Sequence, residues 1–229
     1  MSTQYESLKS PDLYNEAFDV TVPSLPERRD VWPRQPGVFI RLATADGEDT
    51  PRLAEEQPLE KPGREAALGQ FGLVPTWVKS TSDAKLRSTK LVSARAETVT
   101  TSNNFRGAWL AAKRCIVPMM AFQEDDLRSG KAVPTRIARV DGRPMGVAGL
   151  WESWSGADGT TIVSFCLLTV NANSHALMHR YQQPGAEKRM PAVLNEGAYD
   201  AWLTARPEKA REFLRAYPAN WLTANPVQK

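Results

Sequence analysis

Apolar residues along the chain gather in short runs that are rich in valine, isoleucine, leucine and aromatic side chains. Glycine, aspartate and proline separate these runs, which is the pattern of β-strands joined by turns. The pattern predicts strands over 37–44, 68–78, 91–97, 114–122, 134–140, 145–153, 161–172 and 189–194. The sequence DGRP at 141–144 is expected to form a hairpin turn that joins two of them.

Helical spacing of apolar residues is rarer. Phe105, Trp109 and Ala112 fall on one stripe of a predicted helix over 105–114. Further helices are expected over 196–205 and 207–217, and a short helix or turn over 174–181. The polar, proline-rich stretch over 45–64 is expected to be a surface excursion. These elements predict an α+β fold in which a mainly antiparallel or mixed sheet curls into a barrel, with helices packed at its edges.

Composition narrows the class of protein without naming a function. The chain has 229 residues, 41% of them hydrophobic and 24% charged, which predicts one globular domain over residues 1–229. No apolar run is long enough for a membrane span, and the first residues lack a secretory signal, so a cytoplasmic location and no membrane partner are expected. A net charge of +3 permits nucleic-acid binding but does not predict it.

No metal or cofactor is expected from the candidate ligands. Cys115 and Cys166 lie in apolar, strand-like runs and are predicted to be buried, reduced thiols. His175 and His179 have a spacing that can bind a metal on a helix, but no third ligand is evident nearby.

Two segments combine aromatic or charged residues in ways that suit nucleic acid. In the segment 70–79, Phe71 and Trp77 flank Pro75, so they either stack on unpaired bases or end a strand as core aromatics, and the residues alone favour the core. Arg95 and Glu97 alternate with alanines and share one face of a strand, where they form either a surface ion pair or a phosphate cleft.

The segment 114–126 runs from an apolar strand into Glu124, Asp125 and Asp126. A strand that ends in carboxylates suits either a general acid or base or the start of a solvated turn, and the spacing leaves both open. An unrelated small-molecule enzyme that uses these carboxylates is a third, weaker hypothesis.

Five segments in this order resemble one known family. They are FGLVPTWVK, similar to W-G-L-I/V-P-x-W; SARAET with FRGAW, similar to N-A-R-x-E-T and F-R-x-A-W/F; RCIVPMMAFQE, similar to a strand that ends F-Y-E; AGLWE; and FCLLTVNAN with RMPAVL. Each segment alone is weak evidence for the family, but the five together, in order, cover nearly the whole chain and are strong evidence. The chain therefore resembles the SOS-response-associated peptidase (SRAP) family of abasic-site processing proteins.

The resemblance implies a monomer with a pseudo-barrel fold that binds single-stranded DNA in a basic cleft. In the family, a cysteine after Met1 becomes the N-terminus by self-cleavage and captures the aldehyde of an abasic site as a thiazolidine, assisted by a glutamate, a histidine and an asparagine. The residues that correspond to the family glutamate and to its DNA contacts are Glu124, Arg95, Arg106, Thr169, Phe71 and Pro75, with Trp77 beside them.

Three active-site positions depart from the family pattern. Ser2 replaces the cysteine, Ser93 replaces the asparagine, and Gln182 falls where longer-loop members have histidine; His179 can replace that histidine only if the loop shifts. A serine hydroxyl is a far weaker nucleophile than a thiol near neutral pH, although the Ser2 α-amine can still form a Schiff base. That the three changes occur together favours natural divergence over an engineered Ser2.

Two functions remain in competition. The first is an abasic-site processing enzyme whose peptidase and lyase chemistry is active or weakened. The second, slightly favoured, is a pseudoenzyme that binds single-stranded DNA and forms no crosslink, because Gln182 cannot act as an acid or base near neutral pH.

Overall fold

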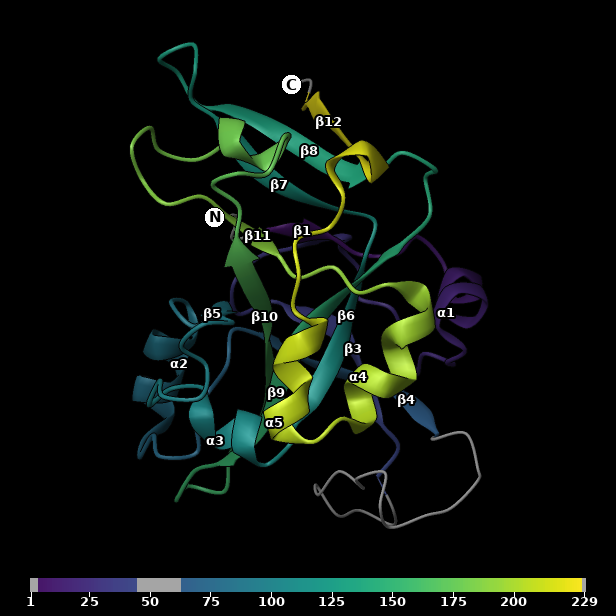
Figure 1. Cartoon of the computed structure of the whole chain (residues 1–229). Coiled ribbons are helices and arrows are strands. Elements are labelled where there is room, and N and C mark those ends of the chain that lie inside the picture. Colours follow the sequence, from purple (N-terminus) through teal and green to yellow (C-terminus); the bar gives the residue numbers. More distant parts are fainter. Residues whose placement is uncertain (1–3, 45–62, 228–229) are drawn as a thin grey trace.

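A computed structural model describes residues 4–44 and 63–227 of the chain. The described residues adopt the α+β fold that the sequence predicts (Figure 1). The predicted surface excursion over 45–64 lies almost entirely outside them. No helix in this part of the chain has the length and apolarity needed to cross a membrane.

Five strands close into a barrel. Around it they follow the order β10, β4, β3, β6 and β9, and β9 pairs again with β10. The pairing of β4 with β10 is parallel and the other four pairings are antiparallel, so the barrel is mixed. The bounds of its strands are β3 Pro36–Leu42, β4 Arg64–Phe71, β6 Arg114–Met119, β9 Met145–Ser155 and β10 Thr161–Asn171.

The second half of β10 carries two further strands. Leu167 pairs with both Gly149 of β9 and Ser93 of β5 (Ser93–Arg95), so β5 lies on the edge that β4 occupies lower down. Thr169 then pairs with Arg95 on that edge and with Pro191 of β11 (Arg189–Pro191) on the other. The end of β10 therefore brings β5 and β11 together beyond the barrel.

A second, fully antiparallel sheet lies across one end of the barrel (Figure 1). Its order is β12 (Leu222–Pro226), β8 (Val133–Arg139), β7 (Ala121–Asp126), β1 (Tyr5–Glu6) and β2 (Asp30–Val31). The predicted single strand over 114–122 is thus wrong in one respect, because the chain leaves the barrel at Met120 and passes from β6 into β7. The predicted hairpin at 141–144 is also wrong: this turn joins β8 to β9, which lie in different sheets.

Short helices surround the barrel. Among the described residues, the α-helices are α1 Pro11–Phe18, α2 Thr81–Ser88, α3 Arg106–Leu110, α4 Tyr199–Thr204 and α5 Pro207–Ala210. The 3₁₀ turns there are η1 Met178–Arg180, η2 Glu196–Ala198, η3 Arg211–Phe213 and η4 Ala219–Trp221. The predicted helices at 105–114, 196–205 and 207–217 are present but shorter or partly 3₁₀. The sequence patterns did not predict α1 and α2.

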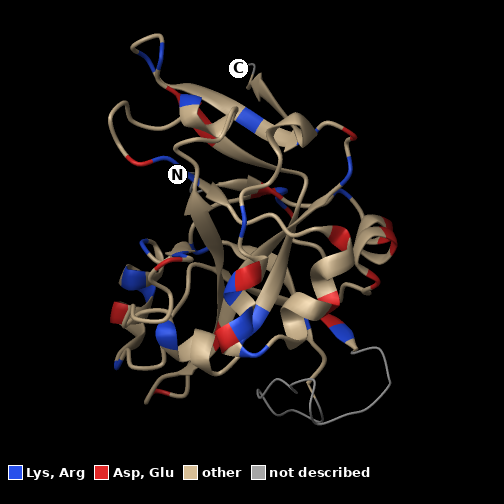
Figure 2. Ribbon diagram, viewed as in Figure 1, with Lys and Arg blue, Asp and Glu red and all other residues tan. Residues whose placement is uncertain are grey.

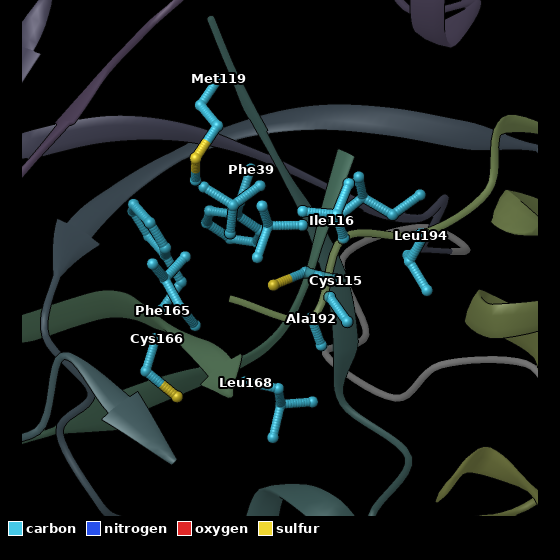
Figure 3. Packing of buried hydrophobic residues seen from close by; sticks show 14 of the residues in the cluster. Phe39, Cys115, Ile116, Met119, Phe165, Cys166, Leu168, Ala192 and Leu194 are labelled. Atoms are coloured by element: carbon cyan, nitrogen blue, oxygen red, sulfur yellow. The ribbon is translucent and has the colours of Figure 1, made fainter. Parts of the chain in front are cut away.

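The interior of the barrel is packed with aromatic and aliphatic side chains. Figure 3 shows Cys115 and Cys166 among Phe39, Phe165 and Leu168. Both thiols are fully buried and free, as predicted, and burial raises the pKa of Cys166 to about 12. Gly149 lies between them: a Cβ atom at this position would be 2.5 Å from the Cys166 carbonyl oxygen and 2.9 Å from Cys115 Sγ.

Candidate functional site

Strand β7 carries Glu124 into the interior. Phe122 and Glu124 are 1% and 5% exposed, whereas Gln123 is half-buried and Asp125 is exposed, because successive side chains of a strand point to opposite faces. Across the sheet, Glu124 lies opposite Thr135, which is also buried. Asp125 is therefore solvated but still within strand β7, and Glu124 is buried, so neither residue begins a turn.

The beginning of the described chain lies beside this carboxylate's strand. Tyr5 of β1 pairs with Phe122, and the backbone N–H of Gln123 donates to the carbonyl oxygen of Gln4 at 3.3 Å. The predicted nucleophile, Ser2, falls outside the described residues. The first residue that the structure does describe, Gln4, thus lies next to the residue that precedes Glu124.

Strand β5 presents Arg95 to solvent. Ala94 is buried against the barrel while Arg95 is exposed, and Glu97, just after the strand, shares its side of the chain. The guanidinium of Arg95 forms an ion pair with Glu187. Ser93, predicted to occupy the family asparagine position, is half-buried at the start of β5 and pairs with Leu167.

Arg189, at the start of β11, forms hydrogen bonds with several residues of this region. Its guanidinium donates to both carboxylate oxygens of Glu97, at 3.1 and 2.8 Å, and to the carbonyl oxygen of Thr169 at 2.8 Å. It also donates to Glu187 at 3.0 Å. Arg189 is 6% exposed, and these contacts satisfy a buried charge that would otherwise be costly.

The side chain of Thr169 faces Arg189 and is shielded from solvent. It is 2% exposed, and its hydroxyl donates to the carbonyl oxygen of Ala94 at 3.3 Å. The same hydroxyl accepts from the Arg189 guanidinium at 3.2 Å. The predicted direct contact of Thr169 with DNA is therefore not available in this structure, because the side chain is enclosed.

Gln182 ties the end of β7 to the start of β11. Its backbone N–H donates to the carbonyl oxygen of Asp125 at 3.2 Å. Its side-chain amide donates to the carbonyl oxygen of Arg189 at 2.7 Å and accepts from the Arg189 N–H at 3.3 Å. Both polar atoms of the amide are therefore used to hold the loop, and the residue adopts a left-handed backbone with φ of 67°.

His179 has one ring nitrogen engaged. Its Nδ1 lies 2.8 Å from the carbonyl oxygen of His175, which can only accept, so this nitrogen is the donor of the hydrogen bond. His175 itself is buried and structural, since its ring nitrogens bond to the Tyr217 carbonyl oxygen and to two backbone N–H groups. In the described residues no three His, Cys, Asp or Glu side chains gather closely enough to hold a metal ion.

A basic cavity opens beside His179. It has a volume of about 610 Å³ and is lined by Leu127, Arg128, His179, Arg180, Gln182, Pro184, Gly185 and Lys188. The hydrogen bonds from Arg128 to Asp126 lower the pKa of that carboxyl group to about 2. The ionised Asp126 offsets the charge of Arg128, so the net positive charge of the cavity comes from Arg180 and Lys188.

The aromatic residues predicted to contact bases separate into two groups. Phe71 is 1% exposed and packs against Tyr5 and Phe165, with ring centroids 5.2 and 5.6 Å away, so the core alternative is correct for it. Pro75 is buried as well. Trp77, in contrast, is 45% exposed, and its indole N–H donates to the carbonyl oxygen of Asn103 at 3.0 Å.

One cation contacts Trp77, and a second exposed cation lies on α3. The guanidinium of Arg87 lies 4.9 Å from the Trp77 ring centroid, in a cation–π contact. Arg106 is exposed at the first residue of α3, and its side chain forms no hydrogen bond or ion pair within the described part of the chain. Elsewhere basic and acidic residues are intermingled along the ribbon (Figure 2).

Sequence reasoning did not select Arg189 or Glu187 as site residues. A charged residue in an apolar strand segment, as in the sequence KRMPAVL, was a usable signal for a buried ion pair. The pairing of Arg189 with Glu97 joins segments far apart in the chain, and only the fold reveals it.

Comparisons with known proteins identify relatives over most of the chain. The family model described as SOS response associated peptidase (SRAP) matches residues 1–229. The abasic site processing protein YoqW of Bacillus subtilis is 30% identical over 162 residues, 69% of this chain and 67% of that protein. The abasic site processing protein HMCES of Gallus gallus is 25% identical and is covered over 51% of its length.

Solved structures of other proteins have the same fold as this chain. A crystal structure of a protein from Bordetella bronchiseptica is similar to this chain with a TM-score of 0.84 and 38% identity, over 99% of this chain and all of that one. A protein from Bacteroides thetaiotaomicron shares the fold with a TM-score of 0.75 at 22% identity, covering 99% of this chain and 92% of that one.

Proposed function

Because the chain belongs to the SOS response associated peptidase family of abasic site processing proteins, we propose that it binds single-stranded DNA that carries abasic sites. One observation supports this most strongly. A continuous set of hydrogen bonds runs from Asp125 through Gln182, Arg189 and Glu187 to Arg95. It links the strand of the candidate catalytic carboxylate, Glu124, to the exposed arginine of β5.

The DNA backbone is held by Arg95 and Arg106 in this proposal. Both side chains are exposed, and a guanidinium binds phosphate through paired hydrogen bonds. Trp77 offers an exposed ring on which a base can stack. The enclosed residues Phe71, Pro75 and Thr169 act indirectly, since they shape the barrel wall and hold Arg189 in place.

Covalent chemistry, where it occurs, starts from the α-amine of Ser2 after Met1 is removed. The amine attacks the aldehyde carbon of the ring-opened abasic sugar to form a C–N bond, and the carbonyl oxygen then leaves as water to give a Schiff base. Loss of a C2′ proton breaks the C3′–O bond and cleaves the strand, and water releases the amine. Glu124 is the group proposed to transfer these protons.

Serine changes the fate of the adduct. A thiol with a pKa near 8.5 adds to the imine carbon and closes a thiazolidine ring, whereas a hydroxyl closes an oxazolidine that reopens readily. Position 182 makes a binding-only function the second candidate, because the Gln182 amide carries no titratable proton and both of its polar atoms bond to the Arg189 backbone.

Intact-protein mass spectrometry tests the proposal. The freshly expressed protein and its Ser2→Cys and Glu124→Gln variants are incubated with an abasic-site oligonucleotide, with and without borohydride. Removal of Met1 and an adduct only after reduction support amine chemistry, and a stable adduct of Ser2→Cys shows that the thiol is the missing group. Retained Met1 and no adduct in the parent protein support binding alone. Failure of all forms to bind the oligonucleotide contradicts both functions.

A further inference from the structure

The carboxylate of Glu187 lies in a ring of hydrogen-bond donors. Its Oε2 accepts from the Arg95 guanidinium. Its Oε1 accepts from the Arg189 guanidinium at 3.0 Å and from the side-chain amide of Asn171 at 2.9 Å. Two cations and one neutral donor therefore converge on a single anionic group, which is the arrangement of an anion-binding site.

The donors of this site are fixed by the barrel. Arg95 lies on β5, Asn171 ends β10, and Arg189 begins β11, and these strands are hydrogen-bonded to one another. Arg189 is 6% exposed and is further held by Glu97 and by Thr169. The donors are thus preorganised by strand pairing, whereas the acceptor comes from the segment between η1 and β11.

Charge in this cluster is balanced one for one. Arg95 and Arg189 supply two positive charges, and Glu97 and Glu187 supply two negative charges. Glu97 is committed to Arg189 through two hydrogen bonds. Removal of the Glu187 carboxylate from the site would leave one uncompensated positive charge, which is the charge that one phosphodiester neutralises.

The pair between Arg95 and Glu187 is open to solvent. Their side chains are 53% and 33% exposed, so an incoming anion can reach both. The backbone around Glu187 is anchored on each side, since the Ala186 N–H donates to the carbonyl oxygen of Gln183 and the Lys188 N–H donates to the side-chain oxygen of Asn173. Rotation of the Glu187 side chain alone is therefore enough to vacate the site.

We propose that Glu187 is an internal substitute for a DNA phosphate: its carboxylate fills the site formed by Arg95, Arg189 and Asn171, and a phosphodiester of single-stranded DNA must displace it. The inference rests on the proposed function, because it concerns the same DNA strand. In this role Glu187 competes with DNA and lowers its affinity. A residue that only orients Arg95 would instead support DNA binding.

The test is the substitution Glu187→Gln, which keeps the shape of the side chain and removes its charge. Binding of an undamaged, fluorescently labelled single-stranded oligonucleotide is measured by anisotropy over a range of salt concentrations. Relative to the parent protein, we expect affinity to rise about two- to fivefold. The slope of log K against log salt should become steeper by about 0.7, as for one additional phosphate contact.

Glu16→Gln is the matched control, since it makes the same change of net charge at an exposed position of α1. It should leave affinity and salt dependence unchanged. In the background of Arg95→Ala, the gain from Glu187→Gln should shrink, because the displaced pair no longer exists. Thermal unfolding of each variant confirms that the fold is retained.

Two results would overturn the inference. If Arg95→Ala weakens DNA binding but Glu187→Gln leaves it unchanged or weaker, the carboxylate orients Arg95 instead of competing, and the proposed DNA-binding function still stands. If neither substitution alters DNA binding, the strand does not pass over this site, and both the inference and the proposed role of Arg95 fail.

Discussion

The guanidinium of Arg189 and the carboxylate of Glu97 pair through two hydrogen bonds, of 3.1 and 2.8 Å, across 92 positions of the chain. Arg189 is nearly enclosed, with 8% of its side chain exposed, whereas Glu97 is 48% exposed. The ion pair therefore joins β11 to the turn that follows β5, with Glu97 on the solvent side of the enclosed arginine.

Arg189→Met should lower the free energy of unfolding by roughly 2–3 kcal/mol, because it removes the enclosed guanidinium hydrogen bonds to the Glu97 carboxylate and to the Thr169 carbonyl oxygen. The urea midpoint of unfolding measures this loss. Arg211→Met, at an exposed position of η3, is the control and should change stability by less than about 0.5 kcal/mol. Equal losses in the two variants would contradict the assigned role of Arg189.

Stability should fall in acid partly through Glu97. Desolvation opposes ionisation of this carboxyl group, but the hydrogen bonds and charge of Arg189 outweigh it and lower its pKa below the ordinary value of 4.5. A lowered pKa in the folded state adds stability above the unfolded pKa, and this stability is lost as pH falls through the lowered value. Glu97→Gln should flatten the fall in unfolding free energy between about pH 5 and pH 3, measured by urea titration; an unchanged slope would contradict the assignment.

Gly149→Ala should destabilise the barrel by about 1–3 kcal/mol, because the new Cβ meets the Cys166 carbonyl oxygen, a backbone atom that cannot move aside.

Gly107→Ala is expected to have the opposite effect on stability. Gly107 lies in α3, and a Cβ atom added there would meet nothing within 4 Å. This change should stabilise the protein by about 0.5–1 kcal/mol through helix propensity, and calorimetry compares the two.

Arg106→Ala should weaken binding of single-stranded DNA at all base sequences and make its salt dependence shallower by about 0.7 in the slope of log K against log salt. Arg143→Ala, at an exposed position in the turn between β8 and β9, removes the same charge outside the proposed DNA contacts and should have little effect. An equal response to both changes would indicate a general charge effect without a defined contact.

Strands were predictable where apolar runs are bounded by clear turns, as in β8, β9 and β10. The break at Met120 was not predictable, because β6 and the first two residues of β7 are buried and the apolar pattern runs across the change of sheet. Helix α1 did carry local signals, with Pro11 at its first turn and Tyr14 and Phe18 buried at helical spacing. Its eight residues are too few for periodicity to stand out from the surrounding polar sequence.

The site was predictable only in part. The placement of Arg95 and Glu97 on one side of the chain follows from the alternation of a strand, and the structure agrees. Their partners, Glu187 and Arg189, come from a loop and a strand nearly a hundred positions later. Side-chain pairs of that kind depend on which strands neighbour β10, and local pattern contains no information about it.

The many partners of β10 also determine the order in which this protein can fold. The barrel closes only when β10 pairs in parallel with β4 and antiparallel with β9, so Gln70 must meet Ser164 across a long stretch of the chain. During synthesis β3, β4 and β6 therefore leave the ribosome first, β9 then covers the edge of β6, and the outer edge of β4 stays unpaired until β10 is made. Contacts of such sequence separation fold slowly, and the open edge of β4 is where a chaperone or an unwanted neighbour would bind.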